Sequence, residues 1–211
     1  INFCLKGEAK YMRIQKSIKK TIDELQNKDF ESAIMHICNA IDGTAQKKNG
    51  TESSRKIFTD FIRSYYDLIS AMAGFSSLDL KNTIWPFETK RCKKPDFAEM
   101  IYGIHRCLNN HGVDIPDGFE FIPDVADSTG TRSINIKKGS IGLSDRFIWA
   151  LIVIVVLDPI NKGIADPVLD GYFFKTRKKD YIINEWWGRL DEFPKLPPKT
   201  SNVILDFSEL Q

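Results

Sequence analysis

The stretch Phe147-Ile-Trp-Ala-Leu-Ile-Val-Ile-Val-Val-Leu157 decides the class of this protein, because it is the longest apolar run in the chain. A helix needs about 20 apolar residues to span a bilayer, and this run is far shorter. Its β-branched side chains leave a strand possible, whereas its length and the preceding Ser144-Asp145 pair favour a helix. We therefore predict a buried helix of a globular domain, with no membrane partner.

The composition allows a sizeable core and excludes a polybasic protein. The chain has 211 residues, of which 42% are hydrophobic and 14 are Phe. This size suits one domain with an elaboration, or two small domains. Lys and Arg total 30 against 28 Asp and Glu, which gives a net charge of +2. The balance argues against a histone-like binder and leaves a local basic patch possible.

The four cysteines, Cys4, Cys38, Cys92 and Cys107, form neither a CxxC pair nor a disulfide framework. A zinc site needs clustered ligands, and these cysteines are widely spaced. We predict reduced thiols in a cytoplasmic protein that uses no metal and no cofactor.

Outward from the apolar run, the chain divides into helical, strand-like and irregular segments. Apolar residues recur at helical spacing in four earlier segments, which are residues 8–28, 29–47, 54–74 and 95–111. Asp29 can cap the second of these helices, and Asp96 can cap the fourth. Residues 117–123 and 131–137 alternate as strands do, which predicts an inserted β-hairpin within 117–138. We therefore predict a mainly α-helical bundle of residues 10–157 that contains this hairpin.

Residues 158–211 are less regular, and we expect this C-terminal extension to pack on the same domain. Within it we predict a short helix near 180–190 and a short strand at 203–207. The Trp186-Trp187 pair is either an exposed stacking platform or an anchor of the extension on the core, and the second role is more typical of paired aromatics.

Asp42 is an unusual residue on the second predicted helix, because it follows Ala40-Ile41 on an apolar stripe. Burial of an unpaired carboxylate is costly, so Asp42 requires a partner. Two roles remain open for it, a structural ion pair and a site role facing Arg106.

The stretch Met100-Ile-Tyr-Gly-Ile-His-Arg-Cys-Leu-Asn-Asn-His-Gly112 predicts a helix that ends at a glycine and gathers polar groups in its last turn. Those groups are Arg106, Asn109, Asn110 and His111. Five residues rotate a helix by about 500°, so Arg106 and His111 point about 140° apart. A single helix therefore does not align the pair.

If Arg106 and His111 converge on a phosphodiester, their chemistry assigns their roles. Arg106 would bind the phosphate and stabilise charge that grows in the transition state. His111 titrates near neutral pH and could move a proton. Cleavage by a 2′-hydroxyl needs both a base and an acid, which a two-fold dimer would supply. The structural alternative is that His111 caps the helix while Arg106 pairs with a carboxylate such as Asp42.

A basic run precedes this helix and contains Lys90, Arg91, Lys93 and Lys94. Four positive charges beside Pro95 indicate a surface loop. This loop either serves solubility or contacts the phosphates of RNA.

The stretch IHRCLNNHG resembles the R-x4-6-H signature of the HEPN superfamily, with Arg106 and His111 at the two motif positions. The upstream stretch DFESAIMHICNAIDGTAQ resembles the helix of such proteins that often ends in Ala-Ile-Asp. The order of the helices up to residue 112 fits as well. The resemblance covers roughly residues 10–157.

The resemblance implies a helical bundle that dimerises, with two motifs forming one composite cleft. Many members are metal-independent ribonucleases that act as toxins of toxin–antitoxin pairs or in antiviral defence. Arg106 and His111 would then be catalytic, with Asn109, Asn110 and Asp42 in support. An RNA substrate, a second copy of the chain and an antitoxin would be the partners.

One position departs from the family pattern. The residue after the arginine is commonly polar in the family, and here it is Cys107. Other members have lost nuclease activity and act as RNA-binding or assembly modules. A non-catalytic RNA-binding or partner-binding module is therefore the alternative function.

Overall fold

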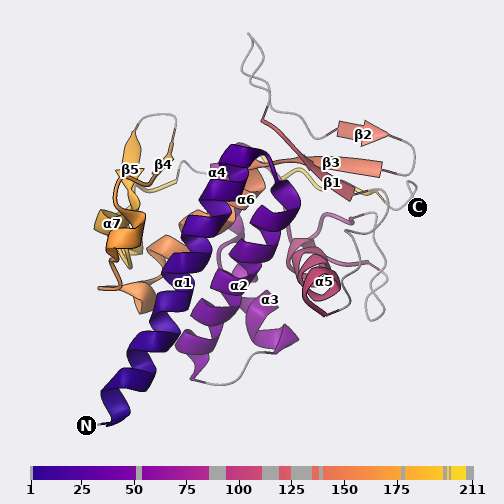
Figure 1. Ribbon diagram of the computed structural model, residues 1–211. Helices are drawn as coiled ribbons and strands as arrows, with labels where there is room; N and C mark the ends of the chain where they lie inside the picture. Colours follow the sequence, from indigo (N-terminus) through magenta and orange to yellow (C-terminus); the bar gives the residue numbers. More distant parts are fainter. Residues whose placement is uncertain are drawn as a thin grey trace.

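The computed structural model is mainly α-helical, as predicted (Figure 1). It describes residues 2–50, 54–85, 94–110, 119–124, 135–137, 140–176, 179–196, 199 and 201–207. Its α-helices are α1 (Asn2–Asn27), α2 (Phe30–Asn49), α3 (Arg55–Arg63), α4 (Tyr66–Ala73), α5 (Phe97–Asn110), α6 (Arg146–Leu157) and α7 (Ile183–Trp186). None of these described helices combines the length and apolar character that crossing a membrane requires.

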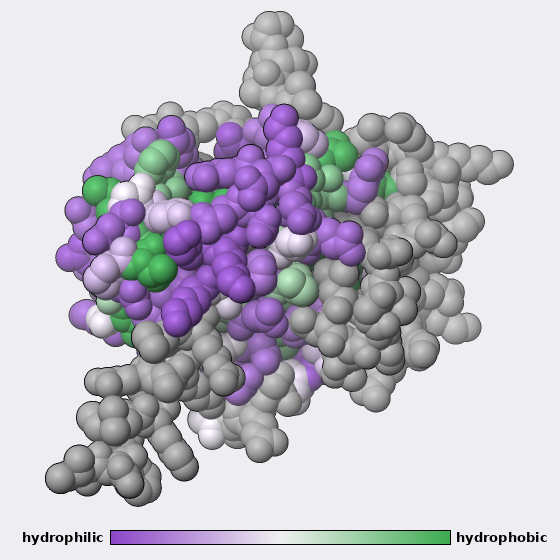
Figure 2. Space-filling model, in the orientation of Figure 1, coloured by the Kyte–Doolittle hydropathy of each residue, from purple (hydrophilic) through white to green (hydrophobic). Residues whose placement is uncertain are grey.

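Helices α1 and α2 lie side by side and form one face of the bundle (Figure 1). A tight turn joins them, in which Lys28 has a positive φ of 62°. Asp29 caps α2, as predicted, because its carboxylate accepts a hydrogen bond of 2.9 Å from the Ser32 backbone N–H. Gly50 ends α2 in the left-handed conformation. The face over these helices is largely hydrophilic, with apolar residues in small separate patches (Figure 2).

The predicted single helix over 54–74 is wrong, because the chain breaks into α3 and α4 at Ser64 and Tyr65. The reason is a hydrogen bond to a residue far along the chain. The Tyr65 hydroxyl donates a 2.8 Å hydrogen bond to the buried carboxylate of Asp158, which also binds the Lys48 ammonium at 2.8 Å. This cluster joins α2, the α3–α4 junction and the end of α6.

Helix α6 confirms the prediction made from the apolar run. Ten of its twelve residues are buried, and it contacts α2 and α4. An apolar helix of this kind is stable because its whole circumference is covered by neighbouring elements. It therefore forms the centre of the core.

The predicted pairing of residues 117–123 with 131–137 is wrong. Strands β1 (Phe119–Ile122) and β2 (Asn135–Lys137) both pair with β3 (Ser140–Ser144), which lies between them in the order β1-β3-β2. The β1–β3 pair is parallel and the β2–β3 pair is antiparallel. The hairpin that forms is thus β2–β3, and it leads directly into α6.

The C-terminal extension packs on the helical core through large apolar side chains. Leu169, Phe174, Tyr181, Ile183, Trp187, Phe193 and Phe207 belong to the same hydrophobic cluster as α2 and α6. Trp187 is buried and Trp186 packs edge-on against Tyr181, so this pair is an anchor rather than an exposed platform.

The extension contains strands β4 (Phe173–Lys175) and β5 (Asp180–Ile182), which pair antiparallel and lie on the side of α1 opposite the three-stranded sheet (Figure 1). The predicted helix over 180–190 is therefore shorter, since β5 takes its first three residues and only α7 remains. Short 3-10 turns occupy Pro159–Asn161, Pro167–Leu169 and Leu190–Glu192. Near the end, Val203 and Asp206 form isolated parallel bridges with Leu78 and Ile84 in place of a full strand.

Candidate functional site

Helix α5 carries most of the predicted site. Arg106, Asn109 and Asn110 lie in its last turns, and Asn110 is its last residue. The side chains of these three residues, and His111 as a whole, lie outside the described residues. What the structure does establish is the frame that presents this end of α5.

One face of α5 is fixed against α2 and α3. Phe97, Met100, Ile101 and Ile104 are buried at helical spacing, as the predicted stripe requires. One residue before Arg106, the His105 ring stacks on Phe58 of α3, with centroids 5.2 Å apart and planes at 5°. The backbone that leads into the motif is therefore held by packing on both neighbouring helices.

The start of α5 is held by charges. Asp96 caps the helix, since its Oδ1 accepts a 2.9 Å hydrogen bond from the Glu99 backbone N–H. Arg63 of α3 binds Asp96 at 2.8 Å and Glu99 at 3.1 Å, and Arg55 binds Glu99 at 2.8 Å. The hydrogen bond to the carboxylate of Asp96 raises the pKa of the Arg63 guanidinium. This network ties α3 to α5 at the end opposite the motif.

Sequence analysis identified Asp96 as a cap but missed Arg63, Arg55 and Glu99. Glu99 follows Arg55 by 44 residues and Arg63 by 36 residues, so local spacing gives no sign of their pairing. The buried Asp158 was also missed. It directly follows the longest apolar run, and that position should have required a partner, as it did for Asp42.

Asp42 is half-buried on α2, and its Oδ2 accepts a 2.8 Å hydrogen bond from the Gln46 amide one turn later. Cys38 lies one turn earlier and is fully buried. Burial, with a smaller contribution from the Asp42 charge, raises the pKa of the Cys38 thiol well above its usual range. Cys38 is thus a neutral core residue, whereas Asp42 is held by the hydrogen bond from Gln46.

The basic run is described only at Lys94, which is exposed. Lys90, Arg91 and Lys93 lie outside the described residues. Lys94 stands just before the start of α5, whereas Arg106 lies nine residues into the helix, or about 14 Å along its axis. Lys94 and Arg106 of one chain therefore lie at opposite ends of α5.

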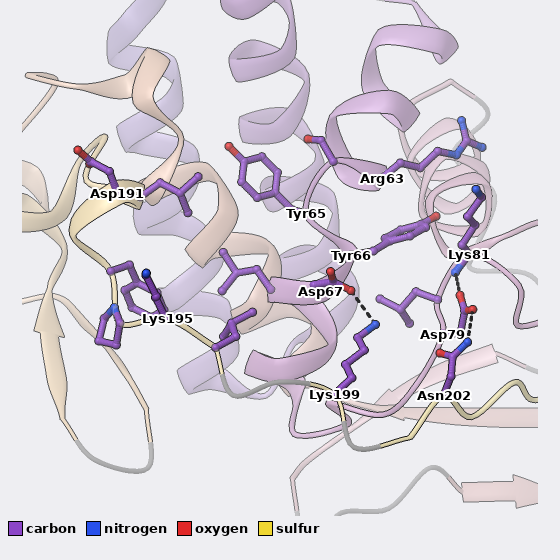
Figure 3. A pocket seen from close by; sticks show the side chains of 17 residues that line it. Arg63, Tyr65, Tyr66, Asp67, Asp79, Lys81, Asp191, Lys195, Lys199 and Asn202 are labelled. Atoms are coloured by element: carbon purple, nitrogen blue, oxygen red, sulfur yellow. Dashed lines mark hydrogen bonds and ion pairs between the residues drawn. The ribbon is translucent and has the colours of Figure 1, made fainter.

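A cavity of about 800 Å³ lies where the C-terminal extension crosses the α3–α4 junction (Figure 3). Two of its acidic groups are held by residues of the chain. Asp67 pairs with Lys199 at 2.6 Å, and Asp79 accepts hydrogen bonds from Asn82 and Asn202. The Tyr66 hydroxyl accepts a 2.9 Å hydrogen bond from the Ala98 backbone N–H. We interpret this cavity as the seam of the extension, since residues of α3, α4 and the extension line it together.

Within the described part of the chain, no group of three or more His, Cys, Asp or Glu side chains could hold a metal ion. The strongest described polar clusters are the Arg63 network and the Asp158 cluster, and both join helices. Their role is to position elements, because each charge in them already has its partner.

Comparison with known proteins places the chain among relatives of nearly the same length. The Rv1289 family model matches residues 13–211. The uncharacterized protein Rv1289 of Mycobacterium tuberculosis and the uncharacterized protein Mb1320 of Mycobacterium bovis are each 30% identical over 203 residues, which is 93% of this chain and 94% of the relative.

A galactokinase of Clostridium acetobutylicum is 27% identical over 107 residues, which is 46% of this chain and 27% of the galactokinase. No solved structure matches the chain. The family match therefore spans both the helical bundle and the C-terminal extension, whereas the galactokinase match covers a small part of that protein.

Proposed function

This chain belongs to the Rv1289 family, and we propose that it is a metal-independent endoribonuclease of the HEPN type that acts as a homodimer. The observation that supports this proposal best is the place of Arg106. It lies in the last turns of α5, a helix packed on α2, and α2 carries Ala40-Ile41-Asp42. The HEPN resemblance implies this order and this neighbourhood, with His111 next after the last residue of α5.

The proposed reaction uses one arginine and one histidine from each chain. A ribose 2′-oxygen forms a bond to phosphorus, and the bond from phosphorus to the 5′-oxygen breaks. One His111 takes the 2′-hydroxyl proton and the His111 of the second chain gives a proton to the leaving 5′-oxygen. Arg106 binds the phosphate through two hydrogen bonds and stabilises its growing charge. The products are a 2′,3′-cyclic phosphate and a 5′-hydroxyl.

The remaining residues would support binding. Asn109 and Asn110 would orient His111 or contact the RNA, and Asp42 would support the arginine from α2. Because Lys94 lies at the far end of α5, the run Lys90, Arg91, Lys93 and Lys94 would contact RNA some distance from the cleavage point. The cellular role that fits this activity is a cytoplasmic toxin or defence effector restrained by an antitoxin partner.

The test is RNA cleavage in the presence of EDTA by the wild type, Arg106→Ala and His111→Ala. We expect the wild type to leave cyclic-phosphate ends and His111→Ala to cleave about 10²–10⁴-fold more slowly, because it loses the proton-transfer group. We expect thermal unfolding of the same preparations to be unchanged, which separates a loss of catalysis from a loss of folding.

His36→Ala is the matched control, because it removes a histidine that the proposal does not use. Cleavage that persists in His111→Ala, or that requires magnesium, contradicts the proposal. Retention of RNA that weakens with salt, without any cleavage, would instead identify the non-catalytic module.

A further inference from the structure

A second cavity is lined by elements far apart in sequence, and none of its lining residues belongs to α5. Its volume is about 460 Å³, within the range of about 300–1,000 Å³ that holds small ligands. It lies between α1, α4, the start of α6, the residues that follow β1, and β4 with the segment before it. Ile22 and Met72 give it apolar walls, and Trp149, Tyr172, Asp124 and Asp145 give it aromatic and acidic ones.

The acidic wall consists of the carboxylates of Asp124 and Asp145, which lie next to each other. The Asp124 backbone N–H donates a 3.0 Å hydrogen bond to Asp145 Oδ1, which fixes the two residues side by side. Arg146 donates to Asp124 Oδ2. The other oxygen, Asp124 Oδ1, is buried and has no hydrogen-bond partner among the described residues, in a side chain that is 12% exposed. Most buried acceptor atoms in proteins receive a hydrogen bond, and this oxygen receives none from the described residues.

Asp145 is the second acidic group of the wall. It is half-buried and forms no ion pair in the described part of the chain. Burial raises the pKa of its carboxyl, which reflects the cost of a carboxylate without a full partner. A bound cation would remove that cost.

Trp149 stands one helical turn after Asp145, so its indole and this carboxylate lie on the same face of the start of α6. The indole lines the cavity, is partly buried, and has neither a ring partner nor a hydrogen-bond partner among the described residues. An uncovered aromatic face beside carboxylates is the usual surrounding of a bound ammonium group.

The neighbouring rings already interact with ammonium groups of this chain. The Lys175 Nζ lies 4.9 Å from the Phe173 ring centroid, and the Lys19 Nζ lies 5.3 Å from that of Tyr172. The cationic side chains that line the cavity already have acidic partners and are not available to bind an anion. Arg146 is bound to Asp124, and Lys175 pairs with Asp180 at 3.6 Å. Asp124 Oδ1 still lacks a donor, and Asp145 lacks an ion-pair partner, among the described residues.

We propose that this cavity binds a small organic cation, a primary alkylamine whose ammonium group is held by Asp145 and Asp124 and whose carbon chain lies on Trp149 and Met72. The ammonium group supplies donors to Asp124 Oδ1 and charge to Asp145. The site is separate from the α5 motif, so it stands whether or not the protein cleaves RNA.

The test compares 1,4-diaminobutane with 1,4-butanediol, which has the same chain and no charge. We expect calorimetry to detect binding of the diamine and no binding of the diol. Asp145→Asn should lower the affinity for the diamine about tenfold or more, because it removes a charged hydrogen-bond acceptor. The diamine should also change the tryptophan fluorescence of the wild type, and Trp149→Phe should remove that change.

Asp191→Asn is the control, because it removes an exposed carboxylate at the other cavity. Thermal unfolding of each variant establishes that it is folded before binding is measured. Equal binding of diamine and diol, no binding of the diamine, or an affinity that Asp145→Asn leaves unchanged overturns the proposal.

Discussion

Helices α5 and α6 both contribute to the core, yet they differ in the kinds of residue that they carry. In α6, ten of twelve residues are buried, and they are all apolar. In α5, six of the nine residues from 97 to 105 are buried, and the charged Glu99 is one of them, while the last turns carry Arg106, Asn109 and Asn110. A helix that buries only apolar residues stabilises the fold, whereas a helix that also carries charged and polar residues can present chemistry. Stability and activity should therefore respond to different substitutions.

The largest expected effect on stability is in α6. Ile152 is fully buried, so Ile152→Ala should lower the free energy of unfolding by about 2–5 kcal/mol through lost burial and a new cavity. The midpoint of urea denaturation measures this change. Ile204→Ala is the control, because Ile204 is 55% exposed. If the two variants lose the same stability, α6 is not the centre of the core.

A smaller effect is expected where charges hold the start of α5. Glu99→Gln removes the charge that binds Arg63 and Arg55, and breaking a fully buried pair costs about 3–5 kcal/mol. Both arginine side chains are about a third exposed, so water reduces the expected loss to about 1–2 kcal/mol. Urea denaturation at low and high salt measures this loss.

Lys56→Gln gives the matched comparison, because it breaks the Lys56–Asp60 pair, in which both side chains are exposed. Its effect should stay within about 0.5 kcal/mol. A Glu99 variant that matches this surface variant would show that the network does not hold α5.

The smallest effect is at the cap of α2. Asp29→Ala should cost about 1 kcal/mol. The hydrogen bond from Ser32 holds the pKa of Asp29 below its usual range. Because the folded protein favours the carboxylate, this stabilisation is complete above the unfolded pKa of about 4 and disappears as the pH falls through the lower folded pKa. The stability difference between wild type and variant should thus be present at neutral pH and absent at about pH 2. A difference that is equal at both pH values would contradict this role.

The sequence predicts those elements whose cause is local. The capped start of α2 at Asp29 and the buried helix α6 are both confirmed, since a cap and an apolar run act within a few residues. The stripe on α5 is confirmed for the same reason.

Elements with distant causes were predicted wrongly. The break at Tyr65 depends on Asp158, which lies 93 residues later. The order β1-β3-β2 depends on a parallel pair that alternation cannot reveal. In the same way, Asp124 and Asp145 lie 21 residues apart in the sequence, and the fold brings them together where the chain after β1 meets the start of α6. For the α5 motif, the sequence supplies the residues, and the structure supplies the packing of the helix that presents them.

The most direct test measures RNA cleavage and thermal unfolding on the same preparations of wild type, His111→Ala and Ile152→Ala, at a temperature where all three are folded. We predict that His111→Ala keeps its melting temperature and loses cleavage, while Ile152→Ala melts earlier and cleaves at the wild-type rate. Cleavage by His111→Ala at the wild-type rate would contradict the account.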